Sequence, residues 1–267
     1  MLPIFYINLD SRPDRRVFME QQFDRLGISA ERVPAITSGE VPVALVAHIA
    51  RPGHLWRLTA GDLACGLSHQ KVWAAIVSRG LSEALVLEDD AVLDVALLPF
   101  LEAGHLQKLN AGLIRLETRR QPVALGRREA IIGDVSLREL GSTHNGTAAY
   151  LMSRDVAASS LGHHLVNQMA LDRFLFGHGG PHLWRTKILQ ADPSPVLQLD
   201  RLHADLSRDG AAKSDIALHK KPRTSRSRLI SDVFRLEGSL VLPRLRQLLR
   251  QPSIARRRKL VAFTADR

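Results

Sequence analysis

The chain has 267 residues, 45% apolar and 24% charged, so it can bury one sizeable core in a single main domain. No apolar run approaches the roughly 20 residues that a membrane-spanning helix needs. The N-terminal run reaches Asp10 without a preceding basic segment, unlike a signal peptide. Cys65 is the single cysteine, so an intrachain disulfide is excluded and a cytoplasmic location is expected.

Positive charge is concentrated near the C-terminus. Residues 201–267 hold 17 Lys and Arg against 6 Asp and Glu, whereas residues 1–200 hold 20 against 21. This asymmetry argues against a nucleic-acid channel through the core and favours a C-terminal surface that meets an anionic partner.

The N-terminal residues have the pattern of a β-α-β unit. Residues 3–9 form a continuous β-prone run, typical of a strand buried on both faces. Pro13 then marks a helix start, and Gly27 marks the end of that helix. Residues 32–36 are predicted to form the second strand.

A longer helix is predicted between Thr59 and Gly80. Thr59 and Asp62 have the spacing of a capping box, in which each side chain hydrogen-bonds the backbone of the other residue. Gly80 provides the matching C-terminal stop. A helix of about five turns is therefore expected here.

Three further strands are predicted, at residues 84–88, 112–116 and 147–152, and Ser153 is expected to cap a following helix. Strands that alternate with helices indicate an α/β domain with a mostly parallel sheet. In such a domain the ligand crevice lies at the carboxyl ends of the strands. We expect this domain to span residues 1–205, and residues 206–267 to form a basic, partly helical extension.

Glu88, Asp89 and Asp90 directly follow one of these strands. Three carboxylates held together at a sheet edge repel one another, and Mg²⁺ or Mn²⁺ would neutralise them with the oxygen ligands that it prefers. The same ion would stabilise charge on a departing nucleoside diphosphate. The alternative is a solvated strand end that caps the next helix, and the triplet alone does not decide between them.

Several blocks of sequence carry a family resemblance: IFYINLD at 4–10, GDLACGLSH at 61–69, ALVLEDD at 84–90, GTAAYLMSR at 146–154 and LD at 171–172. In this order they resemble glycosyltransferase family 25, the lipooligosaccharide galactosyltransferase family, which includes collagen-modifying relatives. The resemblance covers roughly residues 2–200. Residues 117–140 match no block of the family.

The resemblance implies a GT-A fold and a UDP-sugar donor, usually UDP-galactose. It also implies a divalent metal, Mn²⁺ or Mg²⁺, and inversion at the anomeric carbon. The implied acceptor is a growing surface glycolipid or another oligosaccharide.

Donor-binding residues are expected at the end of the first strand and the start of the first helix. Backbone N–H groups and guanidinium groups there suit a base and a diphosphate. The alternative is that Arg15 and Arg16 only form the exposed face of the helix. The candidate donor-binding residues are Asn8, Asp10, Arg12, Arg15, Ser68, His69, Glu88 and Asp89.

The expected metal ligands are Glu88, Asp90 and, from the C-terminal side, His203. Asp172 is the candidate base that takes the acceptor hydroxyl proton, and Asp90 is assigned to catalysis with it. The alternative role for Asp172 is a helix N-cap. Cys65 is interpreted as a packing residue.

The C-terminal residues suggest a membrane contact. Basic clusters at residues 220–228 and 256–259 flank a helical pattern at residues 229–249. We expect a peripheral anchor on anionic lipid, at the cytoplasmic face of the inner membrane, with a solvated tail as the alternative.

Two further functions remain open. One is a metal-dependent phosphoester hydrolase or nucleotidyl enzyme that uses the same carboxylates. The other is an inactive membrane-surface binding protein. Nucleophile-elbow, Walker and dinucleotide-binding motifs are absent from the sequence.

Overall fold

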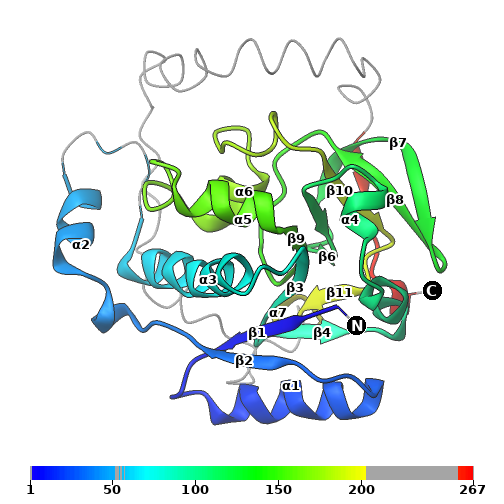
Figure 1. Cartoon of the computed structure of the whole chain (residues 1–267), viewed down its shortest axis with the longest axis horizontal. Helices are drawn as coiled ribbons and strands as arrows, with labels where there is room; N and C mark the ends of the chain where they lie inside the picture. Colours follow the sequence, from blue (N-terminus) through cyan, green and yellow to red (C-terminus); the bar gives the residue numbers. More distant parts are fainter. Residues whose placement is uncertain (1, 52–53, 55, 57, 203–257, 267) are drawn as a thin grey trace.

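A large sheet runs through the structure, which is a computed structural model (Figure 1). The structure describes residues 2–51, 54, 56, 58–202 and 258–266. The strands of the large sheet, in order of pairing, are β12 (Arg258–Leu260), β7 (Pro122–Ile132), β8 (Val135–Leu140), β10 (Ile188–Asp192), β5 (Leu113–Arg115), β9 (Ala149–Ser153), β3 (Glu83–Glu88), β1 (Ile4–Asn8) and β2 (Glu31–Pro34). The predicted α/β class is confirmed.

The sheet is mixed. Strands β2, β1 and β3 pair in parallel, and so do β5 and β10. The predicted parallel arrangement holds for these strands. Strand β9 runs antiparallel between β3 and β5, and the β7-β8 hairpin and β12 extend the sheet antiparallel. Because β9 is antiparallel to β3, the segment that enters β9 lies beside the carboxyl end of β3.

A small second sheet begins at this same edge. It pairs β4 (Ala91–Leu93), β11 (Val196–Gln198) and β6 (Glu117–Thr118), in the order β4-β11-β6. Strand β4 starts directly after the acidic triplet, and β6 starts two residues after β5 ends. The small sheet thus fixes the segments that leave β3 and β5.

Helices cover both faces of the large sheet. On one face, Met19 and Phe23 of α1 share a core cluster with Tyr6 and Leu87. The helical elements on this face are α1 (Pro13–Leu26), η2 (Val95–Leu101) and α4 (His105–Lys108). On the other face, Trp73 and its neighbours share a cluster with the strands, through α3 (Ala60–Ser78), α5 (Arg154–Leu161) and α6 (Leu171–Phe176).

Shorter helices complete the described elements: η1 (Ser38–Glu40), α2 (Val43–Ile49), α7 (Leu199–Leu202) and η5 (Thr264–Asp266). None of the helices in the described ranges is both long enough and apolar enough to cross a bilayer.

The predicted helix boundaries are confirmed. Pro13 opens α1, and Gly27 ends it in the left-handed conformation, with φ 64°, where a side chain would be strained. Thr59 and Asp62 form the predicted capping box of α3. Ser153 caps α5 by accepting a hydrogen bond from the backbone N–H of Val156 at 3.3 Å.

Residues 117–140, in which the sequence analysis found no family block, form β6 and the β7-β8 hairpin. The hairpin projects at one edge of the large sheet in Figure 1. Strand β12, near the C-terminal end of the sequence, pairs with β7 and is the outermost strand at this edge.

The C-terminal residues 258–266 pack against the domain, although the sequence placed them in an extension. Val261 and Phe263 are 0% and 3% exposed. The hydroxyl of Thr118 donates to the backbone oxygen of Val261 at 2.6 Å, and Ser194 donates its backbone N–H to Ala262 at 2.8 Å. Val261 and Phe263 therefore belong to the core of the domain.

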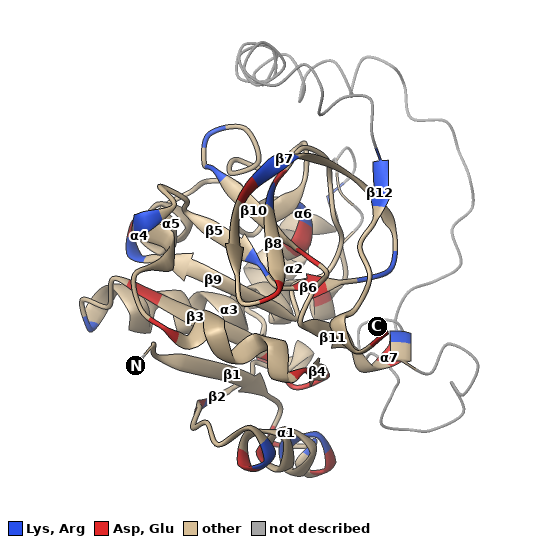
Figure 2. Ribbon diagram, turned by 90° about the vertical axis from the view of Figure 1, so that its right-hand side faces the viewer, with Lys and Arg blue, Asp and Glu red and all other residues tan. Residues whose placement is uncertain are grey.

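Most of the predicted tail lies outside the described residues. This holds for the helical pattern at 229–249, for the basic cluster at 220–228 and for His203. Arg258 and Lys259 of the second basic cluster are described and lie in β12, shown in blue in Figure 2.

We expect Phe263→Ala to lower the free energy of unfolding by about 3 kcal/mol, because it removes a buried ring from the core. Leu260→Ala is the matched control: Leu260 is 53% exposed, and its loss should change stability by no more than about 0.5 kcal/mol. Urea denaturation measures both. Equal effects of the two substitutions would show that this segment does not pack as described.

Candidate active site

Polar side chains from several elements converge at the carboxyl ends of β1, β3 and β5. Asn8 ends β1, Glu88 ends β3, and Asp89 and Asp90 follow it. Asn8, Asp89 and Asp90 are all less than 9% exposed. Buried carboxylates need compensating donors or cations, and each of these has a different set of neighbours.

Asp89 is held by two partners. Its carboxylate accepts hydrogen bonds from the Asn8 amide and from the Arg15 guanidinium, each at 2.8 Å. Arg15 also lies 4.0 Å from the Asp90 carboxylate. Burial nevertheless raises the pKa of Asp89, against the effect of these partners. Asp89 and Arg15 together tie the end of β3 to α1.

The predicted donor-binding residues near β1 separate into two groups. Asn8 and Arg15 are buried within this clamp, so the alternative of an exposed helix face is wrong for Arg15. Asp10 instead pairs with Arg32, and Arg12 pairs with Asp14 at 2.8 Å. The side chain of Asp10 is 79% exposed.

Glu88 accepts hydrogen bonds from both sides. Thr147, in the segment that enters β9, donates its hydroxyl to the Glu88 carboxylate, and the His69 ring lies 3.2 Å from the same oxygen. Burial alone would raise the pKa of Glu88, but the hydrogen bonds from His69 and Thr147 and the charge of His69 lower it. Glu88 is therefore ionised at neutral pH.

The two predicted residues of α3 have different environments. The other ring nitrogen of His69 lies 2.7 Å from the Tyr150 hydroxyl. Ser68 points elsewhere: its hydroxyl donates to the Ala64 backbone and accepts from the Ile36 backbone N–H, both within the protein scaffold. The structure thus brings His69 to the carboxylates and uses Ser68 to fix the loop after β2.

Asp90 is the least compensated carboxylate. Its Oδ1 atom is buried and has no hydrogen-bond partner within the described ranges. Burial, together with the charges of Glu88, Asp89 and Glu117, raises the pKa of Asp90 to about 8, although Arg15 opposes the shift.

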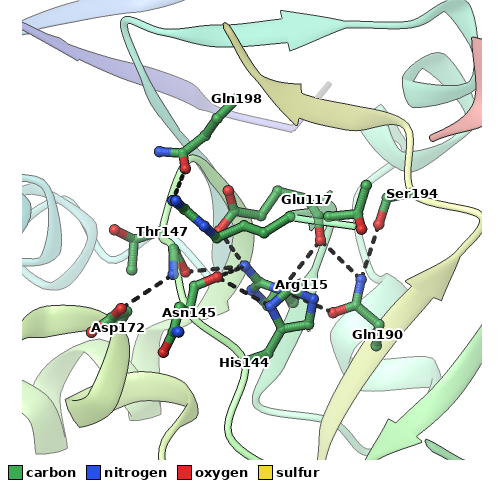
Figure 3. A network of polar contacts seen from close by, with 12 residues as sticks. Arg115, Glu117, His144, Asn145, Thr147, Asp172, Gln190, Ser194 and Gln198 are labelled. Atoms are coloured by element: carbon green, nitrogen blue, oxygen red, sulfur yellow. Dashed lines mark hydrogen bonds and ion pairs between the residues drawn. The ribbon is translucent and has the colours of Figure 1, made fainter. Parts of the chain in front are cut away.

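A second buried network lies beside the triplet and was missed by the sequence analysis (Figure 3). Arg115 ends β5 and forms an ion pair with Glu117, and both side chains are 0% exposed. Arg115 also contacts Gln190 of β10 at 3.3 Å. Burial and the charge of Glu88 raise the pKa of Glu117 to about 7, against the effect of Arg115.

The segment of residues 145–147 links this network to the rest of the site. Arg115 donates to the backbone oxygens of Asn145 and Gly146, at 2.6 and 3.2 Å. Gly146 has φ 97°, and a Cβ atom there would lie 2.5 Å from Glu117. Only glycine fits this position, which explains the glycine in the 146–154 block.

Asp172 lies on the opposite side of this segment, as Figure 3 shows. It sits in the first turn of α6, whose N-cap is Ala170, so the N-cap role is wrong. Its carboxylate accepts hydrogen bonds from the backbone N–H of Gly146 at 3.3 Å and of Arg173 at 2.7 Å. Gly146 therefore connects Asp172 to the buried network.

The residues present fit a hard divalent cation. Asp90 and Glu117 each keep one buried carboxylate oxygen without a hydrogen-bond partner in the described part of the chain. Glu88 has a lowered pKa, and its charge raises the pKa of both Asp90 and Glu117. Asp89 is fully engaged by Asn8 and Arg15, so the triplet offers Glu88 and Asp90 for a cation and not all three carboxylates.

Known proteins are similar in sequence to this chain over the region that forms the site. A family model described as glycosyltransferase family 25 (LPS biosynthesis protein) matches residues 1–175. A glycosyltransferase 25 family member of Drosophila pseudoobscura pseudoobscura is 35% identical over 115 residues, which cover 40% of this chain and 18% of the relative.

Two further relatives have names that differ in the activity they state. Procollagen galactosyltransferase 1 of Danio rerio is 33% identical over 132 residues, covering 45% of this chain and 22% of the relative. The inactive glycosyltransferase 25 family member 3 of Mus musculus is 34% identical over 95 residues, covering 33% and 16%. The matches thus span less than a quarter of the length of each of these three relatives.

The family match includes the ends of β1 and β3, the segment before β9 and Asp172, which are the parts that form the site. It extends over well over half of the chain. The chain belongs to glycosyltransferase family 25.

Proposed function

We propose that this protein transfers a hexose, with galactose the first candidate, from a UDP-sugar to a glycan acceptor, and that a divalent cation assists the reaction. Support comes from the family, from a procollagen galactosyltransferase among the relatives, and from the acidic site. The observation that carries the proposal is the unpartnered, buried oxygen of Asp90 beside ionised Glu88.

In this proposal Asp90 and Glu88 would hold the cation, and the charge of Glu117 acts on Asp90. Bound there, Mn²⁺ or Mg²⁺ would supply positive charge to the donor diphosphate and to the departing UDP. Arg15 and Asn8 act indirectly, by holding Asp89 and with it the geometry of the triplet. We also propose a GT-A fold for the domain at residues 1–205.

Asp172 is proposed as the base of an inverting reaction. A carboxylate can take the proton of the acceptor hydroxyl as the hydroxyl attacks the anomeric carbon. The Gly146 N–H fixes the orientation of Asp172, and the same segment places Thr147 against Glu88. One backbone segment therefore sets the position of the base relative to the cation ligands.

We propose a lipopolysaccharide, lipooligosaccharide or related glycan as the acceptor, in keeping with the family description. A glycolipid acceptor fits a protein that works at the cytoplasmic face of a membrane. The basic clusters at residues 220–228 and 256–259 would supply the attraction to anionic lipid.

Calorimetric titration with a panel of nucleotide sugars tests the donor. A UDP-hexose should bind best, and only with Mn²⁺ or Mg²⁺ present, because a cation held by Glu88 and Asp90 would supply positive charge to the donor diphosphate. Release of UDP that depends on a saccharide acceptor would then establish transfer. Tight binding of another nucleotide would contradict the donor assignment, and acceptor-independent phosphate release would favour the hydrolase.

We expect Asp90→Asn to stabilise the cation-free protein as the pH rises. The folded-state pKa of Asp90 is raised from 3.8 to about 8. Between these values the carboxyl ionises in the unfolded chain but stays protonated in the folded protein, so stability falls as the pH rises through this window. An amide avoids that loss, which should exceed about 1 kcal/mol by pH 8. Thermal unfolding at pH 5 and pH 8 measures the difference.

The exposed Asp24, on α1, provides the control Asp24→Asn, which should show no such pH dependence. Asp90→Asn should also abolish the stabilisation of the wild-type protein by Mn²⁺. A variant that is less stable than the wild type at pH 8, or that Mn²⁺ still stabilises fully, would contradict the role of Asp90.

Asp172→Asn should lower kcat by about 10²- to 10⁴-fold, because the amide cannot accept the proton. Donor affinity should not change, since Asp172 is not a cation ligand in this proposal. Asp155 occupies the equivalent first turn of α5 and is exposed, so Asp155→Asn is the matched control. An unchanged kcat in Asp172→Asn would remove Asp172 from catalysis.

A further inference from the structure

Three side chains of different ligand chemistry meet beside the carboxylates. Cys65 and His69 lie four residues apart in α3, on one helix face, and Glu88 ends the neighbouring strand β3. One ligand atom from each, a thiol sulfur, an imidazole nitrogen and a carboxylate oxygen, lies within 4.8 Å of the other two. We propose that Cys65, His69 and Glu88 form a binding site for a thiolate-preferring divalent cation of the zinc type.

The spacing suits such an ion. Zinc binds sulfur, nitrogen and oxygen ligands at about 2.0–2.3 Å, so its tetrahedral ligand atoms lie roughly 3 to 4 Å apart. The His69 nitrogen and the Glu88 oxygen are already 3.2 Å apart. The spread of 4.8 Å across the whole set leaves only a small rotation of the side chains to close it.

The surroundings of His69 support the ligand role. Its Nδ1 atom lies 2.7 Å from the Tyr150 hydroxyl, which accepts a hydrogen bond from the Trp73 indole at 3.0 Å. Trp73 and Tyr150 are both 0% exposed, so this support is rigid. A cation at Nε2 would replace the proton that His69 shares with Glu88, and Nδ1 would keep its proton towards Tyr150, which is the usual arrangement at zinc sites.

This site differs in kind from the oxygen site proposed above. Mn²⁺ and Mg²⁺ prefer oxygen ligands, whereas a thiolate selects zinc and cobalt. Binding releases the Cys65 thiol proton to solvent, and the side chain of Glu88, 20% exposed, leaves room for a fourth ligand. Because Glu88 belongs to both sites, zinc should inhibit the transfer reaction, a consequence that rests on the proposed function.

Cobalt spectroscopy of the tag-free, full-length protein tests the site without any activity assay. Cys65 is the single cysteine of the chain, so a thiolate-to-cobalt charge-transfer band can come from no other residue. The wild-type protein with one equivalent of Co²⁺ should show this near-ultraviolet band together with intense visible bands of a four-coordinate ion. Zinc should displace the cobalt and remove both.

Cys65→Ala should lose the charge-transfer band and weaken cobalt binding at least about tenfold. Loss of a residue that only supports a metal ligand already has an effect of this size. His48→Ala is the control. It removes one of two histidines that share Gln168 at 2.7 and 3.2 Å, and it should leave the band intact. Circular dichroism checks that both variants are folded.

Absence of the band in folded wild-type protein would overturn the proposal, as would visible cobalt bands without it, since the ion would then be bound elsewhere. The UDP-sugar titration is a separate test. If the band is present but no UDP-sugar binds, the cation site stands and the transferase proposal fails.

Discussion

Four carboxylates, Glu88, Asp89, Asp90 and Glu117, gather at the carboxyl ends of β3 and β5, and their mutual repulsion is the constraint that organises the site. Three of them have dedicated partners. Asp89 has Asn8 and Arg15, Glu88 has His69 and Thr147, and Glu117 has Arg115. Asp90 keeps a buried oxygen without a hydrogen-bond partner among the described residues. The protein compensates much of the charge itself, and Asp90 is the carboxylate that the proposed cation would neutralise.

The fold makes this arrangement through one antiparallel strand. Because β9 runs between β3 and β5 in the opposite direction, residues 145–147 enter it at the edge where both neighbours end. Arg115, Glu88 and Asp172 all contact this segment. A shift of the segment would therefore disturb the proposed cation ligands and the proposed base together.

The sequence predicted the features that local chemistry determines. The helix starts at Pro13 and Thr59, the stop at Gly27 and the acidic triplet after β3 depend on residues close in sequence, and the structure has them as expected. The family blocks also indicated Asn8, His69 and Asp172, which all lie at the site.

The Arg115 network could not be predicted in this way. It joins β5, β6, β10 and the segment before β9, so its contacts exist only after the sheet has formed. Arg115 and Glu117 stand two residues apart, outside the blocks that carried the family resemblance, and nothing in the pattern shows that both become fully buried. Strand β12 was missed for a similar reason, since its partner β7 lies more than 120 residues away in sequence.

The central claim is that Asp90 holds a cation, with Glu88, while Asp89 stays with Arg15. A crystal structure with Mn²⁺ and UDP, with the ion located by its anomalous scattering, tests this most directly. The account predicts an anomalous peak within coordination distance of Asp90 and the Asp89–Arg15 pair unchanged. A peak that does not contact Asp90, or one reached by Asp89 after release from Arg15, would contradict it.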